Sequence, residues 1–153
     1  MAATTQSVAS SSQITYVGSG SAIAAAGIMV SSDISTALVA STNLAKYPLA
    51  DLALAFAPTA SIAAASSVIH VYRRDAGEPL PLTNTSSTYK QHYVGSFTVK
   101  NNTVSTAETV TYVLSDVPLN GLVDCEFYIE NGTAINIPAG WTLKVTPKTF
   151  AAA

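Results

Sequence analysis

The fold is decided by the stretch Leu52-Ala53-Leu54-Ala55-Phe56-Ala57-Pro58. Large apolar residues recur at every second position, and alanine fills the positions between them. A spacing of two places the large side chains on one face of a β-strand and the alanines on the other. Pro58 ends the pattern, because proline supplies no N–H to a sheet. The stretch therefore predicts a strand with one face of large side chains and one face of small ones.

The same alternation continues outward along the chain, interrupted by residues that favour turns. Further strands are predicted at residues 68–74, 93–99, 108–114, 125–129 and 141–145. In the 93–99 strand we expect Tyr93 on the same face as Phe97. We expect turns at residues 101–102 and 116–121 and a loop at residues 77–87, and the 141–145 strand should end before Pro147. Asn131-Gly132 is the strongest short hairpin signal.

These elements predict an all-β fold. No amphipathic segment is long enough to connect parallel strands, and short strands separated by turns indicate an antiparallel sandwich or barrel. Six strands follow residue 47, and the N-terminal region adds one or two. We therefore expect a single antiparallel β-sandwich, jelly-roll-like, whose body spans residues 46–153.

Residues 1–45 have a different composition, rich in Ser, Ala, Thr and Gly, with Asp33 as the only charge. We interpret them as an extended N-terminal arm with short strands, and a floppy tail is the alternative. Such β-prone patches can pair with the sheet edge of another subunit. Deletion of residues 1–40 should then leave a folded body. The predicted partner-binding residues are Ile14, Tyr16, Val17, Ile28 and Val30.

The residues that carry chemistry are scattered. His70 and His92 have no further ligand near them at zinc spacing, and no Gly-x-Ser-x-Gly nucleophile motif occurs. Glu126 and Glu130 share a strand face at about 13 Å along it, too far for a glycosidase pair, whose carboxyls lie about 5–9.5 Å apart. We therefore predict that the protein is not an enzyme and has no catalytic, cofactor-binding or metal-binding residues.

The remaining singular residues are predicted to serve packing. Cys125, the one cysteine, cannot form an internal disulfide, and it alternates in phase with Phe127 as a buried, inert thiol would. Trp141 falls in phase with the expected core. Tyr89 and Tyr93 are the aromatics expected to be exposed, and they keep a carbohydrate-binding module open as an alternative.

The composition narrows the choice of partners. Only 10% of the residues are charged and the formal net charge is −2, against about 25% charged residues in ordinary soluble domains. We expect no nucleic-acid partner, since Arg73-Arg74 is the one adjacent basic pair. We expect no membrane span, since residues 49–72 contain Asp51 and Pro58. The first residues resemble no secretory signal. An uncharged surface is suited to being covered by neighbouring proteins.

Several tracts between residues 47 and 147 resemble the small structural proteins of tailed bacteriophages, above all capsid decoration (cement) proteins. The resemblance rests on their texture and order: Ile69-His70-Val71-Tyr72-Arg73-Arg74-Asp75, Tyr93-Val94-Gly95-Ser96-Phe97, Val117-Pro118-Leu119, Phe127-Tyr128-Ile129-Glu130-Asn131 and Pro138-Ala139-Gly140-Trp141-Thr142-Leu143. It implies a β-sandwich or β-tulip body with an extended terminal arm, present as trimers or other oligomers over the joints between capsid subunits.

The expected function follows from this resemblance. The protein would be a non-enzymatic virion protein that binds the outer surface of the phage head and stabilises it. Its partners would be the major capsid protein and copies of itself, as a trimer. Its location would be the capsid surface of the virion, after assembly in the host cytoplasm. A tail, collar or head-fibre protein of a phage and a carbohydrate-binding β-sandwich module are the alternatives.

Overall fold

The computed structural model describes residues 5–9, 13–33, 47–62, 67–75, 93–99, 108–119 and 125–152. The described residues form strands and one short 3-10 helix, with no α-helix among them, so the predicted all-β class is confirmed. Among the described residues, six strands follow residue 47, as the alternation predicts, and two precede it, where one or two were expected. The elements are β1 (Thr5–Ala9), β2 (Ile14–Gly20), η1 (Ser31–Asp33), β3 (Leu49–Phe56), β4 (Val68–Asp75), β5 (Tyr93–Thr98), β6 (Val110–Pro118), β7 (Cys125–Asn131) and β8 (Trp141–Ala152).

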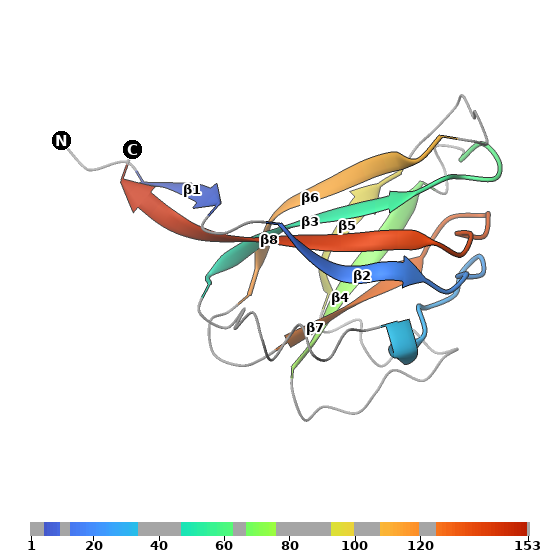
Figure 1. The fold of residues 1–153 in the computed structure, drawn as a ribbon, viewed down its shortest axis with the longest axis horizontal. Coiled ribbons are helices and arrows are strands. Elements are labelled where there is room, and N and C mark those ends of the chain that lie inside the picture. The colour runs from blue at the N-terminus through green and yellow to red at the C-terminus, as the bar shows by residue number, and fades with distance from the viewer. Residues whose placement is uncertain are drawn as a thin grey trace.

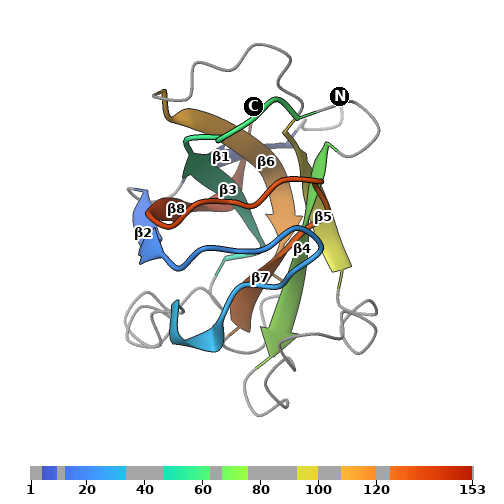
Figure 2. The same cartoon turned by 90° about the vertical axis from the view of Figure 1, so that its right-hand side faces the viewer.

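The strands form two sheets with antiparallel pairing throughout. In the larger sheet, β1 and β2 lie on one edge of β8, and β3 and β6 follow on its other side. The smaller sheet has the order β5-β4-β7. Figure 1 shows the larger sheet in front, and Figure 2 shows the two sheets as layers. After β2 the chain crosses to the smaller sheet, where Ile28 bridges Glu130 of β7.

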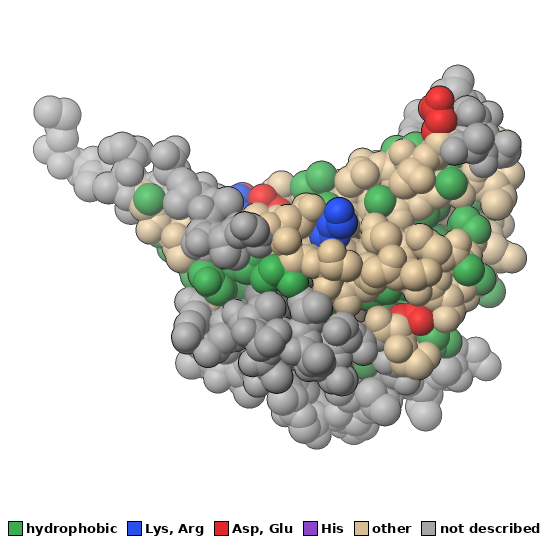
Figure 3. Space-filling model, in the orientation of Figure 1, with side chains coloured by type: hydrophobic (Ala, Val, Ile, Leu, Met, Phe, Trp, Pro, Cys, Tyr) green, Lys and Arg blue, Asp and Glu red, His purple; other side chains and the backbone are tan. Residues whose placement is uncertain are grey.

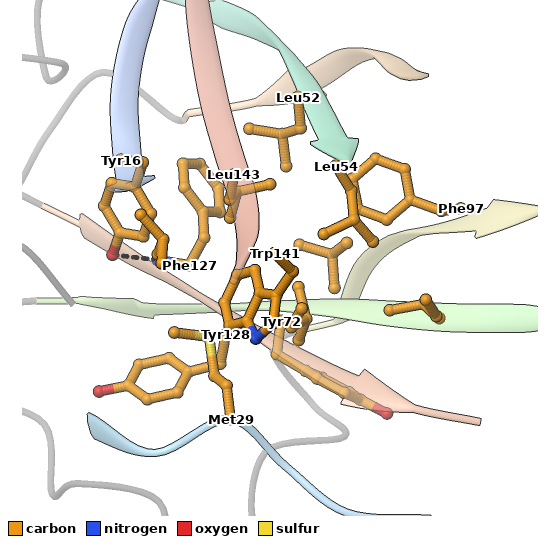
Figure 4. Close-up of a cluster of buried hydrophobic side chains, with 14 of the residues drawn as sticks. Tyr16, Met29, Leu52, Leu54, Tyr72, Phe97, Phe127, Tyr128, Trp141 and Leu143 are labelled. Atoms are coloured by element: carbon orange, nitrogen blue, oxygen red, sulfur yellow. Dashed lines mark hydrogen bonds between the residues drawn. The ribbon is translucent and has the colours of Figure 1, made fainter. Parts of the chain in front are cut away.

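One core fills the space between the sheets (Figure 4). The predicted alternation of β3 is confirmed, since Leu52, Leu54 and Phe56 are buried. Trp141 of β8 is 1% exposed, as its phase predicts. Each fully buried large apolar side chain contributes about 1.5–3 kcal/mol relative to exposure. The smaller sheet and the neighbouring loops supply the opposite side of the core: Ile69, Val71, Phe97, Phe127, Ile129 and Ile137.

The residues after position 13 belong to this core rather than to a separate arm. Tyr16 and Val17 of β2 are 1% and 2% exposed. The Tyr16 hydroxyl accepts a hydrogen bond of 2.9 Å from the backbone N–H of Phe127 in the opposite sheet. The division into an arm of residues 1–45 and a body of residues 46–153 therefore fails for residues 13–33. Their short apolar patches lack a visible period because each one packs at a different place in the body.

Asn131-Gly132 does not form the predicted hairpin, because β7 pairs with β4 whereas β8 pairs with β3. Asn131 is instead fully buried and holds two loops together. Its Nδ2 donates to the carbonyls of Ala24 and Ile135, at 3.1 and 2.7 Å. Its Oδ1 accepts the backbone N–H of Thr133 at 3.0 Å, which is an Asx turn. Asn131 is thus a junction between the sheets and not a hairpin residue.

Candidate interaction surfaces

β8 extends beyond the rest of the larger sheet. β3 pairs with β8 only as far as Lys148, and the following residues, 149–152, pair with β1. We name β1 together with residues 148–152 the ribbon. Figure 1 shows the ribbon projecting from the two-sheet body. The expected end of the strand before Pro147 is wrong, because Pro147 pairs with Ala50 of β3 and is buried within a continuous strand.

The ribbon carries an exposed aromatic side chain. Phe150 is 59% exposed, which is unusual for a residue of its size. In β8 the buried residues Trp141, Leu143 and Val145 alternate with residues on the outer face, and Phe150 falls in phase with the outer residues. Phe150 therefore extends the outer face of the larger sheet onto the ribbon.

The outer face of the larger sheet is built mainly from small, uncharged side chains, and Lys144 is the charged residue among them. The register places Val113, Ala53 and Lys144 side by side on β6, β3 and β8. Thr111, Ala55 and Thr142 form the next row in the same way. Val113 is 61% exposed. Figure 3 looks onto this face and shows few charged side chains on it. We call these two rows the outer face. With one charge among its six residues, this surface has few charged groups to desolvate on contact.

A three-residue ionic cluster ties the strands together where the ribbon begins. Lys148 Nζ lies 2.7 Å from Asp116 Oδ1 and 3.2 Å from Asp51 Oδ1. The bond to Asp116 is the main reason why the pKa of Lys148 is raised; Asp51 adds to the rise and burial opposes it. The cluster joins β8, β6 and β3, and Lys148 is 9% exposed.

Asp116 reaches this cluster because β6 has a bulge and not the predicted turn. Between the pairs Ala50–Val117 and Leu52–Leu114, β6 has one residue more than β3. Asp116 adopts the left-handed conformation, with φ of 57°, which Asp tolerates better than most residues. The carboxylate of Asp51 accepts a hydrogen bond of 2.9 Å from the backbone N–H of Asp116, so this N–H of the bulge has a partner.

The smaller sheet has a polar and aromatic outer face. Its register aligns Ser96, His70 and Glu130 in one row across β5, β4 and β7. His70 Nδ1 lies 2.9 Å from Ser96 Oγ. The Tyr72 hydroxyl donates to Glu130 Oε2 at 2.6 Å; burial, followed by this bond, raises the pKa of Tyr72. These polar groups satisfy one another, which favours a structural role for His70.

Tyr93 is 50% exposed, as expected, but it does not share the face of buried Phe97. The register shifts between the pairs Val71–Gly95 and Tyr72–Tyr93. This irregularity reverses the alternation, so Tyr93 and Ser96 lie on the same face, and the Tyr93 hydroxyl is 2.7 Å from Ser96 Oγ. The Tyr93 ring also packs edge to face against Tyr72, at 5.9 Å between centroids.

The predicted partner-binding residues do not form one surface. Tyr16 and Val17 are buried in the core, so their side chains have no exposed surface to offer a partner. Ile14 is half-buried opposite Val145 on β8, whereas Ile28 and Val30 are half-buried beside the other sheet. Any contact of these three with a partner remains a prediction.

The sequence analysis did not predict the two exposed large apolar residues of the larger sheet, Phe150 and Val113. The signal for Phe150 is its phase: extending the alternation of Trp141 through Pro147 would have placed it opposite the core. Tyr89 and His92 lie outside the described residues, as does the side chain of Cys125.

Within the described ranges no three His, Cys, Asp or Glu side chains gather closely enough to hold a metal ion. The described part of the chain has no helix long and apolar enough to cross a membrane. No protein-family model matches the chain, and no curated protein matches it significantly.

Proposed function

We propose that the fold is an eight-stranded jelly roll. The two sheets of a jelly roll have the strand orders 1-8-3-6 and 2-7-4-5. The larger sheet fits this order if β1 and β2 together act as the first strand. In the smaller sheet, residues 28–30 beside β7 take the place of the second strand, since Ile28 bridges Glu130 and the Met29 N–H bonds to Ile129 O at 3.0 Å. Viral capsid proteins and lectins use this architecture.

We propose that the protein is a non-enzymatic phage virion protein, a capsid decoration (cement) protein that binds the outside of the head and stabilises it. The observation that carries this proposal is the weakly charged outer face of the larger sheet, which has exposed Val113 within it and exposed Phe150 beside it. Contact with a protein lattice through this face would bury one charge, that of Lys144, so the desolvation penalty is small. The partners are the major capsid protein and sister copies on the virion surface, after assembly in the host cytoplasm.

The test places a charge on the outer face. The binding partner is a particle that lacks its own copy of the protein. Val113→Glu should lower the affinity measured by co-sedimentation with such particles about tenfold or more, because the contact would bury an unpaired carboxylate. Thr98→Glu is the matched control, since Thr98 is an exposed strand residue of the smaller sheet. Equal binding of both variants and the unmodified protein would contradict docking through this face.

Two alternatives are separated by other measurements. A tail, collar or head-fibre protein could use the same face, and gold-labelled protein would then appear on those parts of the particle instead of the head. A carbohydrate-binding module is favoured by half-exposed Tyr93 beside Ser96 and His70. Glycan-array binding that disappears in Tyr93→Ala would support that module.

A further inference from the structure

β1 is attached to the rest of the molecule through a single strand. Its five residues pair one-to-one with residues 148–152 of β8, from Thr5–Ala152 to Ala9–Lys148. Residues 149–152 lie past the end of β3, so among the described residues β1 is their one neighbouring strand. A two-stranded ribbon on its own is marginally stable in water. The ribbon therefore needs support that the described body does not provide.

The hydrogen-bond ladder is interrupted between β1 and β2. Both strands pair with the same edge of β8, but β1 stops at Lys148 and β2 starts at Val145. Thr146 and Pro147 fall between the two registers, and proline has no N–H to donate to a neighbouring strand. The linking sequence Ser10-Ser11-Ser12-Gln13 contains no apolar residue. β1 can therefore separate from β8 without disturbing the core residues of β2.

We infer that β1 is exchanged between copies of this chain, so that Thr5–Ala9 of one copy pairs with residues 148–152 of the next. Exchange keeps every backbone hydrogen bond of the ribbon, because the donated strand is identical to the one that leaves. Such swaps are a low-cost route to symmetric oligomers, and a head-to-tail exchange can close into a ring. The ribbon then gains a neighbouring body, against which exposed Phe150 can pack.

This inference builds on the proposed role as a repeated structural unit and names what joins the copies. It is tested on the free protein, so its failure is separate from a failure to bind particles. Cys125→Ala first removes the native thiol. Gln6→Cys is placed on one chain and Ala151→Cys on a second, isotope-labelled chain, because Gln6 and Ala151 are register partners. Cα separations in an antiparallel pair, about 4.5–5.5 Å, suit a disulfide.

Refolding the two chains together and oxidising them should give a disulfide between one chain of each kind as the main product, identified by mass spectrometry. Gln6→Cys with Lys144→Cys is the out-of-register control and should give no such product. Chains that carry both changes should form covalent rings or ladders on a non-reducing gel. An internal disulfide in these doubly changed chains, with no mixed product from the pair, would overturn the inference.

A deletion provides a second measurement. Full-length protein should have a multiple of the monomer mass by light scattering, and a chain without residues 1–9 should be a folded monomer. A full-length protein that is monomeric, or a deleted chain that keeps the full multiple, would refute the exchange.

Discussion

At Gly20, β2 passes so close to Trp141 that no side chain fits between them. A Cβ at this position would overlap the indole ring. The Trp141 ring is itself fixed, since its Nε1–H donates to the carbonyl of Ser21 at 2.7 Å. The contact holds β2 against the first residue of β8, with which Gly20 is paired.

Gly20→Ala should therefore destabilise the protein by about 1–3 kcal/mol, the usual cost of overpacking. Gly18→Ala is the control in the same strand, because a Cβ there would meet Thr15 at an ordinary 3.6 Å. Urea denaturation of the two variants measures the difference. Equal midpoints would show that β2 does not depend on this contact.

Asn131 contributes at the residue scale through hydrogen bonds instead of packing. Asn131→Ala should cost about 3 kcal/mol or more, because several buried groups lose their partner and each such loss costs about 1–3 kcal/mol. Asn136→Ala is the matched control, since exposed Asn136 accepts one bond, from the N–H of Ala25 at 3.0 Å. Thermal melting of both should show the larger loss for Asn131→Ala, and the reverse order would contradict the junction.

Residue patterns predict strand faces where the alternation is unbroken and fail where it is interrupted. The faces of β3 and the burial of Trp141 follow directly from a period of two. The exposure of Phe150 and the face of Tyr93 do not, because Pro147 lies within a strand and β5 is irregular near Gly95. The burial of Tyr16 depends on a partner in the opposite sheet, which no local pattern contains.

At the scale of elements, the ionic cluster of Lys148, Asp51 and Asp116 fixes three strands at the base of the ribbon. Lys148→Met should lower stability at neutral pH by about 1–2 kcal/mol, a modest value because Asp116 is half-exposed to solvent.

The pKa of Lys148 is raised in the folded state, so its contribution is fully present below the unfolded pKa and is lost as pH rises through the folded one. The stability difference between the unmodified protein and Lys148→Met should therefore persist to about pH 10 and shrink above it. Thermal melts from pH 7 to higher pH measure this. Lys144→Met, in the same strand, is the control. If the stability difference for Lys148→Met stayed constant with pH, Lys148 would not contribute through its charge.

At the scale of the whole molecule, the N-terminal region has two parts. β1 is proposed to join copies of the chain, whereas residues 13–33 belong to the folded core. Deletion of residues 1–12 removes β1 and should leave a cooperatively melting body. Deletion of residues 1–33 removes the buried side chains Tyr16, Val17, Ile23 and Met29. Their loss removes about 6–12 kcal/mol at about 1.5–3 kcal/mol each, which is comparable with the whole stability of a domain, about 5–15 kcal/mol, so the shortened chain should not melt cooperatively. If the chain without residues 1–33 melted cooperatively at an unchanged temperature, the N-terminal region would be a separate arm after all.

The proposed role, covering the outside of a phage head, can be tested with a cryo-electron microscopy map of the particles whose genome encodes the chain. We expect repeated density on the head exterior that fits the two-sheet body. The outer face of the larger sheet should lie toward the capsid lattice, and ribbons should join neighbouring copies. Particles without this density on the head, or with it confined to the tail, would contradict the claim.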